Sequence, residues 1–214
     1  MVEPQGNTVV LSLDLPSAEA TRELGRALGG ALGAGDLLVL TGDLGAGKTT
    51  LTQGLGEALG VRGPVTSPTF VIARVHPSLV DGPALVHVDA YRLGGALELD
   101  DLDLDASVEE SVTVVEWGHG LASLLSPDYL ELVLRTTADP TDPPEPSDET
   151  DETDETDETD ETDETDETPR TATLMAVGPR WGSPPARAAL EALVALQALV
   201  ALQAPVVLPP ARGS

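Results

Sequence analysis

The sequence predicts an α/β fold in three layers, in which helices cover a central and mostly parallel sheet. Short apolar runs alternate along the chain with segments whose leucines recur at helical spacing. A glycine-rich loop joins one of these runs to one of these helices, and two later runs each end on or near a carboxylate. Because alternating strands and helices are typical of βαβ units, we expect most strands to be parallel.

The chain before the glycine-rich loop predicts a strand, a helix and a second strand. Residues 8–15 are largely apolar and alternate with polar residues towards their end, which indicates a strand. Ser17 is the expected N-cap of a helix whose leucines lie four residues apart. Residues 36–40 form a short apolar run bounded by glycines and predict a buried strand.

Residues 42–49 fit the phosphate-loop spacing G-x-x-x-x-G-K-S/T, and residues 50–59 predict a helix directly after it. The backbone N–H groups of such a loop point at phosphate oxygens, and the helix N-terminus favours an anion. Lys48, the only lysine of the chain, would reach the β- and γ-phosphates, and the Thr49 hydroxyl would bind Mg²⁺. The alternative is a glycine-rich turn that binds no ligand. The expected phosphate-binding residues are Gly42, Asp43, Leu44, Gly45, Ala46, Gly47, Lys48, Thr49 and Thr50.

A segment rich in hydroxyl groups follows this helix. Taken alone, Ser67, Pro68, Thr69 and Phe70 indicate a polar turn before a strand that begins in the apolar run 71–75. In a phosphate-loop protein, however, the segment after the first helix is where switches that sense the γ-phosphate occur. These four residues are therefore also the candidate switch-like loop.

Two further predicted strands, residues 85–92 and 111–117, carry Asp89 and Glu116 near their ends. Nucleotide chemistry needs an acid at the tip of a strand beside the phosphate loop, where it holds Mg²⁺ directly or through water. Either acid could instead cap its strand or pair with an arginine. The acidic run 98–105 between the strands lacks the glycine and the final glutamate of a calcium loop, so it predicts short surface helices.

The C-terminal part of the chain predicts a short helix at 121–126 and an antiparallel hairpin formed by 129–135 and 171–177. Seven Asp-Glu-Thr repeats lie between the two hairpin strands, at 148–168. The segment 138–169 has almost no apolar residues and carries charge of one sign, so we expect it to be disordered.

Composition predicts a final helix at 184–203, which contains a tandem repeat and leads into a low-complexity tail. The chain then divides into four parts. These are a phosphate-loop core (1–137), a disordered acidic insertion (138–169), the returning strand (170–182) and the C-terminal helix with its tail (183–214).

Charge and composition exclude several classes of protein. The formal net charge is −26, and the fourteen carboxylates of the repeats leave −12 for the rest of the chain. High-affinity binding of nucleic acid relies on Lys and Arg that neutralise phosphates, so we expect any RNA to be held by another protein. The chain has no cysteine, which fits a cytoplasmic protein, and residues 1–5 lack the features of a signal peptide. Its most apolar segment, 188–203, is interrupted by polar residues and too short to cross a membrane. His76 is expected to be exposed and to have no role.

The individual motifs also occur in a specific order. They are GDLGAGKTT at 42–50, TSPTF at 66–70, HVDAYRL at 87–93 and VEW at 115–117. In this combination the sequence resembles the bacterial TsaE (YjeE) family, the ATPase component of the tRNA threonylcarbamoyladenosine system. The resemblance is close over residues 8–136 and looser over 171–182, and the repeat insertion and the long tail depart from the family pattern.

The resemblance implies a three-layer phosphate-loop NTPase that binds ATP and Mg²⁺. It implies that the protein works with the TsaB–TsaD pair, which modifies adenosine 37 of tRNAs that read ANN codons, and that tRNA is contacted only through these partners. Thr49 and Glu116 would bind Mg²⁺, and Asp89 would be a second acid, either behind the metal or orienting the attacking water. Together with Lys48, the two acids form the expected catalytic set.

The resemblance also places Tyr91 and Trp117 on the surface that supports the site or faces the partner. Two other functions are possible: a small-molecule or nucleotide kinase, and a nucleotide-gated binding module. A kinase needs several arginines around an acceptor site, whereas the candidates are scattered along the chain: Arg62, Arg74 and Arg92. A GTPase is disfavoured because its base-reading loop needs an Asn and a Lys together, and the chain has one of each, Asn7 and Lys48.

Overall fold

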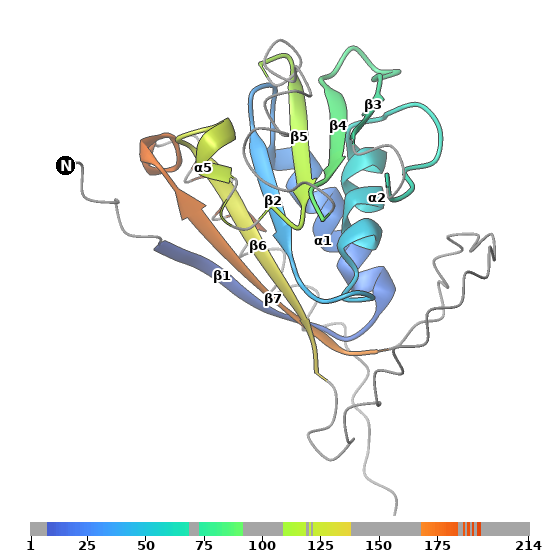
Figure 1. The fold of residues 1–214 in the computed structure, drawn as a ribbon, viewed down its shortest axis with the longest axis vertical. Helices are drawn as coiled ribbons and strands as arrows, with labels where there is room; N and C mark the ends of the chain where they lie inside the picture. The colour runs from blue at the N-terminus through green and yellow to red at the C-terminus, as the bar shows by residue number, and fades with distance from the viewer. Residues whose placement is uncertain are drawn as a thin grey trace, which may run out of the picture.

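The computed structural model describes residues 8–68, 73–91, 109–118, 120, 122–137, 168–183, 186, 188, 190, 192 and 193. The elements follow one another along the chain as Figure 1 shows. They are β1 (Thr8–Leu15), α1 (Ala18–Ala31), β2 (Leu37–Thr41), α2 (Lys48–Ala58), β3 (Ala73–His76), β4 (Ala84–Asp89), β5 (Ser111–Glu116), α5 (Ala122–Leu125), β6 (Tyr129–Thr136), β7 (Arg170–Val177) and the 3-10 helix η1 (Pro179–Gly182).

The strands described here form one seven-stranded sheet in the order β1-β7-β6-β2-β5-β4-β3. Its centre, β6-β2-β5-β4, is parallel, whereas β1 and β7 on one side and β3 on the other pair antiparallel. The sheet is therefore mixed, and the expectation of a mostly parallel sheet holds only for its centre. Because the four central strands run in one direction, their carboxyl ends lie at the same edge, which is where a ligand site is expected in an open α/β sheet.

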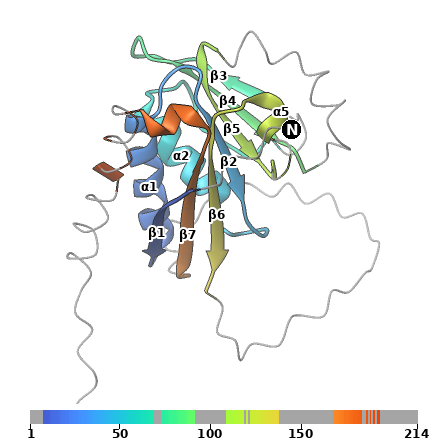
Figure 2. The same ribbon diagram turned by 90° about the vertical axis from the view of Figure 1, so that its left-hand side faces the viewer.

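Helices α1 and α2 pack on one face of the sheet (Figure 2). Side chains alternate between the two faces of β2: Leu38 and Leu40 join the core under these helices, and Leu37 and Val39 join the core on the other face. In the described part of the chain, the helical cover of this second face is the short α5, which contributes Ala122. The expected third layer is thus represented by α5 alone among the placed elements.

Helix α1 begins where the sequence predicts it. The Ser17 backbone is extended, and its hydroxyl oxygen accepts a hydrogen bond from the Ala20 N–H at 3.2 Å, as an N-cap does. Leu24 and Leu28 lie on the buried face of the helix.

Helices α1 and α2 approach each other closely through small residues. A Cβ on Gly25 of α1 would overlap the carbonyl oxygen of Leu51, and a Cβ on Gly54 of α2 would overlap that of Arg22. At the rim of this contact, Glu57 pairs with Arg22 and Arg26, with N–O distances of 3.2 and 2.7 Å. The absence of side chains at the two glycines is what allows this backbone contact.

The predicted hairpin is confirmed. Strands β6 and β7 pair antiparallel from Tyr129 opposite Val177 to Thr136 opposite Arg170. The insertion that joins them, including all but the last residue of the Asp-Glu-Thr repeats, lies outside the described residues, so its disorder stays a prediction. The same holds for the acidic run 98–105.

No continuous C-terminal helix is seen in the part of the chain that the structure describes, although the sequence predicts one at 184–203; the residues placed in that segment (186, 188, 190, 192 and 193) all have a helical backbone. Most of that segment lies outside the described residues. Two of its placed side chains, Leu190 and Leu193, are buried in the core that α1 and α2 cover. None of the helices described is long and apolar enough to cross a membrane.

Candidate nucleotide site

The phosphate-loop motif connects β2 to α2, as the sequence predicts. Gly47 is the N-cap of α2, has a φ of 98° and carries no side chain that could cap the helix. Since the first N–H groups of a helix have no partner within it, the N-terminus of α2 presents free donors and a positive dipole end to the loop. Gly42 has a φ of 155°, and a Cβ there would overlap the Leu134 carbonyl oxygen, so β6 leaves no space for a side chain at this position.

Lys48 is held across the loop by the loop backbone. Its Nζ donates to the carbonyl oxygens of Gly42 and Asp43 at 2.9 and 2.8 Å, and it lies 4.0 Å from the centre of the Trp117 ring. Burial lowers the pKa of Lys48 from its usual 10.5, and the negative charges of Glu116, Asp89 and Asp43 oppose this shift. The result is a mostly buried ammonium group whose position is set before any anion binds.

Glu116 meets the motif at the end of β5. Strand β5 pairs directly with β2, which places Glu116 opposite Leu40 and just before the loop. The carboxylate is 3% exposed, and its Oε1 accepts a hydrogen bond from the Thr49 hydroxyl at 3.2 Å. The structure thus brings together the two residues that the sequence analysis names as metal ligands.

Asp89 lies beside Glu116 at the end of β4 and faces it in the register of the parallel pair. One of its oxygens, Oδ1, accepts a hydrogen bond from the Tyr91 N–H at 2.9 Å, so this acid shapes the turn that follows its strand. Its negative charge, like that of Glu116, opposes the lowering of the Lys48 pKa that burial causes.

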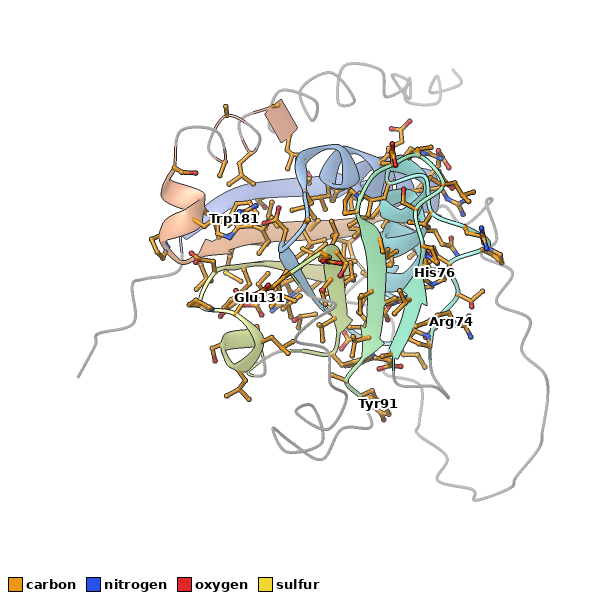
Figure 3. The ribbon with its side chains drawn as sticks, turned by 90° about the horizontal axis from the view of Figure 1, so that it is seen from above. Arg74, His76, Tyr91, Glu131 and Trp181 are labelled. Carbon is orange, nitrogen blue, oxygen red and sulfur yellow. The ribbon has the colours of Figure 1, made fainter. Side chains whose placement is uncertain are left out.

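Two aromatic residues lie beside these acids. Trp117 directly follows Glu116 and has a φ of 60°, a left-handed conformation that costs free energy in a residue with a large side chain. Its ring lies 5.1 Å from that of Tyr91, which is 68% exposed and projects away from the body of the fold (Figure 3). Tyr91 therefore forms the outer rim of the site, and Trp117 lies between that rim and Lys48.

The structure describes only the first half of the candidate switch-like loop, Ser67 and Pro68. Just before it, Thr66 accepts a hydrogen bond from Arg74 of β3 at 2.7 Å. Thr69 and Phe70 lie outside the described residues, so the role of this loop stays a prediction.

His87 is a residue of the site that its sequence pattern alone did not reveal. This residue is fully buried on β4, and its Nε2 lies 2.9 Å from Glu116 Oε1. The signal was present, because His87 precedes Asp89 by two residues and so points to the same face of the strand. The expectation for His76 is wrong in one respect: this histidine is buried, 4% exposed, because β3 is covered at that position.

The residues present fit a magnesium ion that is shared with a phosphate. No group of three or more His, Asp or Glu residues converges on one point in the described ranges, so the protein alone does not form a full coordination shell. Mg²⁺ in nucleotide sites usually takes one or two protein oxygens and completes its shell with phosphate oxygens and water. Thr49 and Glu116 offer two such oxygens already in contact.

Fold and motif together define a class: an α/β protein with a phosphate-loop motif at the carboxyl edge of its parallel strands. The family model described as threonylcarbamoyl adenosine biosynthesis protein TsaE matches residues 15–142. The chain belongs to the TsaE family.

Relatives agree with this assignment. The chain is 70% identical over 112 residues to the tRNA threonylcarbamoyladenosine biosynthesis protein TsaE of Streptomyces coelicolor, covering 52% of this chain and 76% of that protein. It is 38% identical over 123 residues to the protein of the same name from Bacillus subtilis, covering 56% and 75%. The crystal structure of YdiB from Bacillus subtilis is similar in fold, with a TM-score of 0.61 and 26% identity over 90% of this chain and 98% of that one.

Proposed function

We propose that this protein binds ATP and Mg²⁺ at the loop 42–49 and hydrolyses ATP in the threonylcarbamoylation of tRNA. The observation that carries the proposal is the contact of Thr49 with Glu116 beside an ammonium group, Lys48, that the loop backbone already holds in place. The chain belongs to a family described as tRNA threonylcarbamoyladenosine biosynthesis proteins, and this membership supports the assignment to the threonylcarbamoylation of tRNA.

Each residue of the site has a defined task in this proposal. The N–H groups at the start of α2 and the Lys48 ammonium bind the β- and γ-phosphates and stabilise the charge that develops during phosphoryl transfer. Thr49 and Glu116 hold Mg²⁺, which supplies further neutralisation of the phosphate oxygens. Asp89, which faces Glu116, orients the attacking water or the shell around the metal.

We further infer that the protein acts with TsaB–TsaD type proteins and does not itself hold the tRNA. The net charge of −26 supports this, since direct binding of RNA would require a basic surface. Leu44 and Tyr91, which are 92% and 68% exposed, give the rim of the site an apolar surface that a partner protein could cover.

ATP turnover by the wild type and by Lys48→Ala, each alone and with TsaB–TsaD type proteins, tests the proposal. We expect slow turnover by the wild type alone and faster turnover with the partners. Loss of the ammonium should lower turnover by about 10²–10³-fold, the usual cost of removing one preorganised donor. Unimpaired tRNA modification by Lys48→Ala would contradict the assignment of the loop, and rapid phosphorylation of a free small molecule would indicate a kinase instead. Tight binding of ATP without any turnover, with or without partners, would indicate a nucleotide-gated binding module.

A further inference from the structure

His87 differs from an ordinary core histidine in what its ring contacts. It is fully buried on the face of β4 that packs against α2, the same face as Leu85. Its Nε2 lies 2.9 Å from Glu116 Oε1, and its Nδ1 has no hydrogen-bond partner among the residues placed in the structure. Within those residues, the single hydrogen bond of the ring is thus the one to Glu116.

The contact is made to the oxygen that also contacts the phosphate loop. Glu116 Oε1 accepts a hydrogen bond from Thr49 Oγ1 at 3.2 Å, in addition to the contact with His87. A carboxylate can only accept hydrogen bonds, so His87 must carry its proton on Nε2 and donate it. Two donors, one on α2 and one on β4, therefore fix the position of a single carboxylate oxygen.

This matters because a glutamate side chain is flexible. Glu116 has three side-chain torsions, and a metal ligand that is free to rotate must lose this freedom when the ion binds. Residues that hold a ligand from behind fix its orientation, and such residues often affect metal affinity nearly as much as the ligands do.

We propose that His87 is a positioning residue for the divalent cation: by donating from Nε2, it holds the Glu116 carboxylate facing Thr49. This inference rests on the proposed function of the site. In this proposal His87 contacts neither the nucleotide nor the metal and acts only by holding Glu116.

A second histidine that is buried among the described residues provides a matched control. His76 lies on the neighbouring strand β3 and is 4% exposed, and its Nε2 has no hydrogen-bond partner among the described residues. A substitution at His76 thus perturbs the packing of a buried imidazole without touching Glu116.

The test compares two substitutions of His87 by amide side chains, Gln and Asn, which differ in how far the amide nitrogen extends from the backbone. In His87→Gln the side-chain nitrogen lies near the position of Nε2, whereas in His87→Asn it lies near that of Nδ1 and does not reach Glu116. Calorimetry on the full chain would measure the affinity for a non-hydrolysable ATP analogue at increasing MgCl₂ and, separately, in EDTA. Circular dichroism would verify that each variant is folded.

We expect His87→Asn to raise the Mg²⁺ concentration for half-maximal effect by about 10–100-fold. Its affinity in EDTA should stay close to that of the wild type, because Lys48 and the loop are unchanged. His87→Gln and the control His76→Gln should both resemble the wild type in their dependence on Mg²⁺.

Three outcomes would overturn the proposal: an unchanged Mg²⁺ requirement in His87→Asn, an equal loss in His87→Gln, or an equal loss in EDTA. A measurement on the wild type keeps the proposal testable even if His87→Asn does not fold. Nitrogen NMR of the histidine rings should find His87 protonated on Nε2, and a ring without that proton would refute the arrangement. If the wild type binds no ATP analogue at any Mg²⁺ concentration, the proposed function fails, whereas the NMR result still decides the contact with Glu116.

Discussion

The parallel centre of the sheet and its antiparallel flank are both built from apolar strands, but they are buried differently. All six residues of β5, in the centre, are buried, whereas buried and half-buried residues alternate along most of β7, in the flank. The centre is covered on both faces and the flank mainly on one, which is the usual difference between parallel and antiparallel strands.

The two regions also differ in how their strands end. In the centre, three strands end at the same edge of the sheet. Strand β2 leads into the phosphate loop, β4 ends at Asp89 and β5 ends at Glu116. The acidic insertion joins β6, the outermost strand of the parallel centre, to β7, the first strand of the flank. We conclude that β2, β4 and β5 hold the candidate site and require close packing, whereas the connection from β6 to the flank strand β7 tolerates added chain. Five predictions test this contrast, from the largest expected effect to the smallest.

Removing the charge of Glu116 should have the largest effect. Glu116→Gln keeps the shape of a buried side chain but loses the negative charge opposite Thr49, so we expect ATP turnover to fall by about 100-fold and to need more Mg²⁺. Steady-state kinetics at several Mg²⁺ concentrations would measure both. In Asp89→Asn, we expect turnover to fall while the Mg²⁺ requirement changes less; the reverse pattern would exchange the roles of the two acids.

Filling the contact between α1 and α2 should destabilise the fold. In Gly25→Ala the new Cβ overlaps the Leu51 carbonyl oxygen, so the helices must move apart, and we expect a loss of about 1–3 kcal/mol in the free energy of unfolding. Gly30→Ala is the matched control, since a Cβ there meets nothing within 4 Å and should stabilise α1 by up to about 1 kcal/mol. Urea denaturation of both variants measures the difference, and equal stability would show that the contact is not tight.

Breaking the ion pair between Arg180 and Asp36 should cost less. Asp36 is 2% exposed and keeps a hydrogen bond from the Gly33 N–H at 2.8 Å, whereas Arg180 is about half exposed, so solvent weakens the pair. We expect Arg180→Ala to lower the free energy of unfolding by about 1–2 kcal/mol, less than for a fully buried pair. Arg135→Ala, at an exposed arginine of β6, serves as the control. An equal loss of unfolding free energy in both variants would show that the ion pair does not contribute specifically to stability.

Deleting residues 148–168 should change stability by about 1 kcal/mol or less, because the free energy of closing a loop depends only weakly on its length. Affinity for ATP should be unchanged, since none of the expected site residues lies in the repeats. Thermal unfolding and calorimetry of the deletion variant would measure both quantities. A large fall in the melting temperature would show that the flank depends on the insertion.

The smallest effect should appear as a pH dependence of stability. Burial lowers the pKa of His76 below its usual 6.5, so the unfolded chain takes up this proton at a higher pH than the folded one. The stability that His76 contributes is therefore present above pH 6.5 and is lost as the pH falls below it. In His76→Gln, the free energy of unfolding should fall less steeply below pH 6.5 than in the wild type. Denaturation measured on both sides of pH 6.5 gives this slope, and the same slope in both proteins would contradict this account.

Local features of the fold and site were predictable because their causes are local. The N-cap Ser17 and the strand, loop and helix around Lys48 follow from residues close together in sequence. The hairpin of β6 and β7 was predictable although a long insertion separates its strands, because each strand has its own apolar pattern. The acids Asp89 and Glu116 were identified from strand ends, and the structure places them side by side. His87 lies two residues before Asp89 and so on the same face of β4, but the sequence does not show that its partner is Glu116 of β5, and His87 was missed.

The sequence by itself thus determined the phosphate-loop motif, the order of the elements and the identity of the candidate ligands, since each depends on a short run of residues. Only the tertiary structure decided that β1 pairs with β7, that Gly25 and Gly54 join two helices, and that His87 and Thr49 share one oxygen of Glu116. These are contacts between residues far apart in the chain. Which of the many possible long-range pairings forms depends on how all the elements pack at once, and no local pattern records that choice.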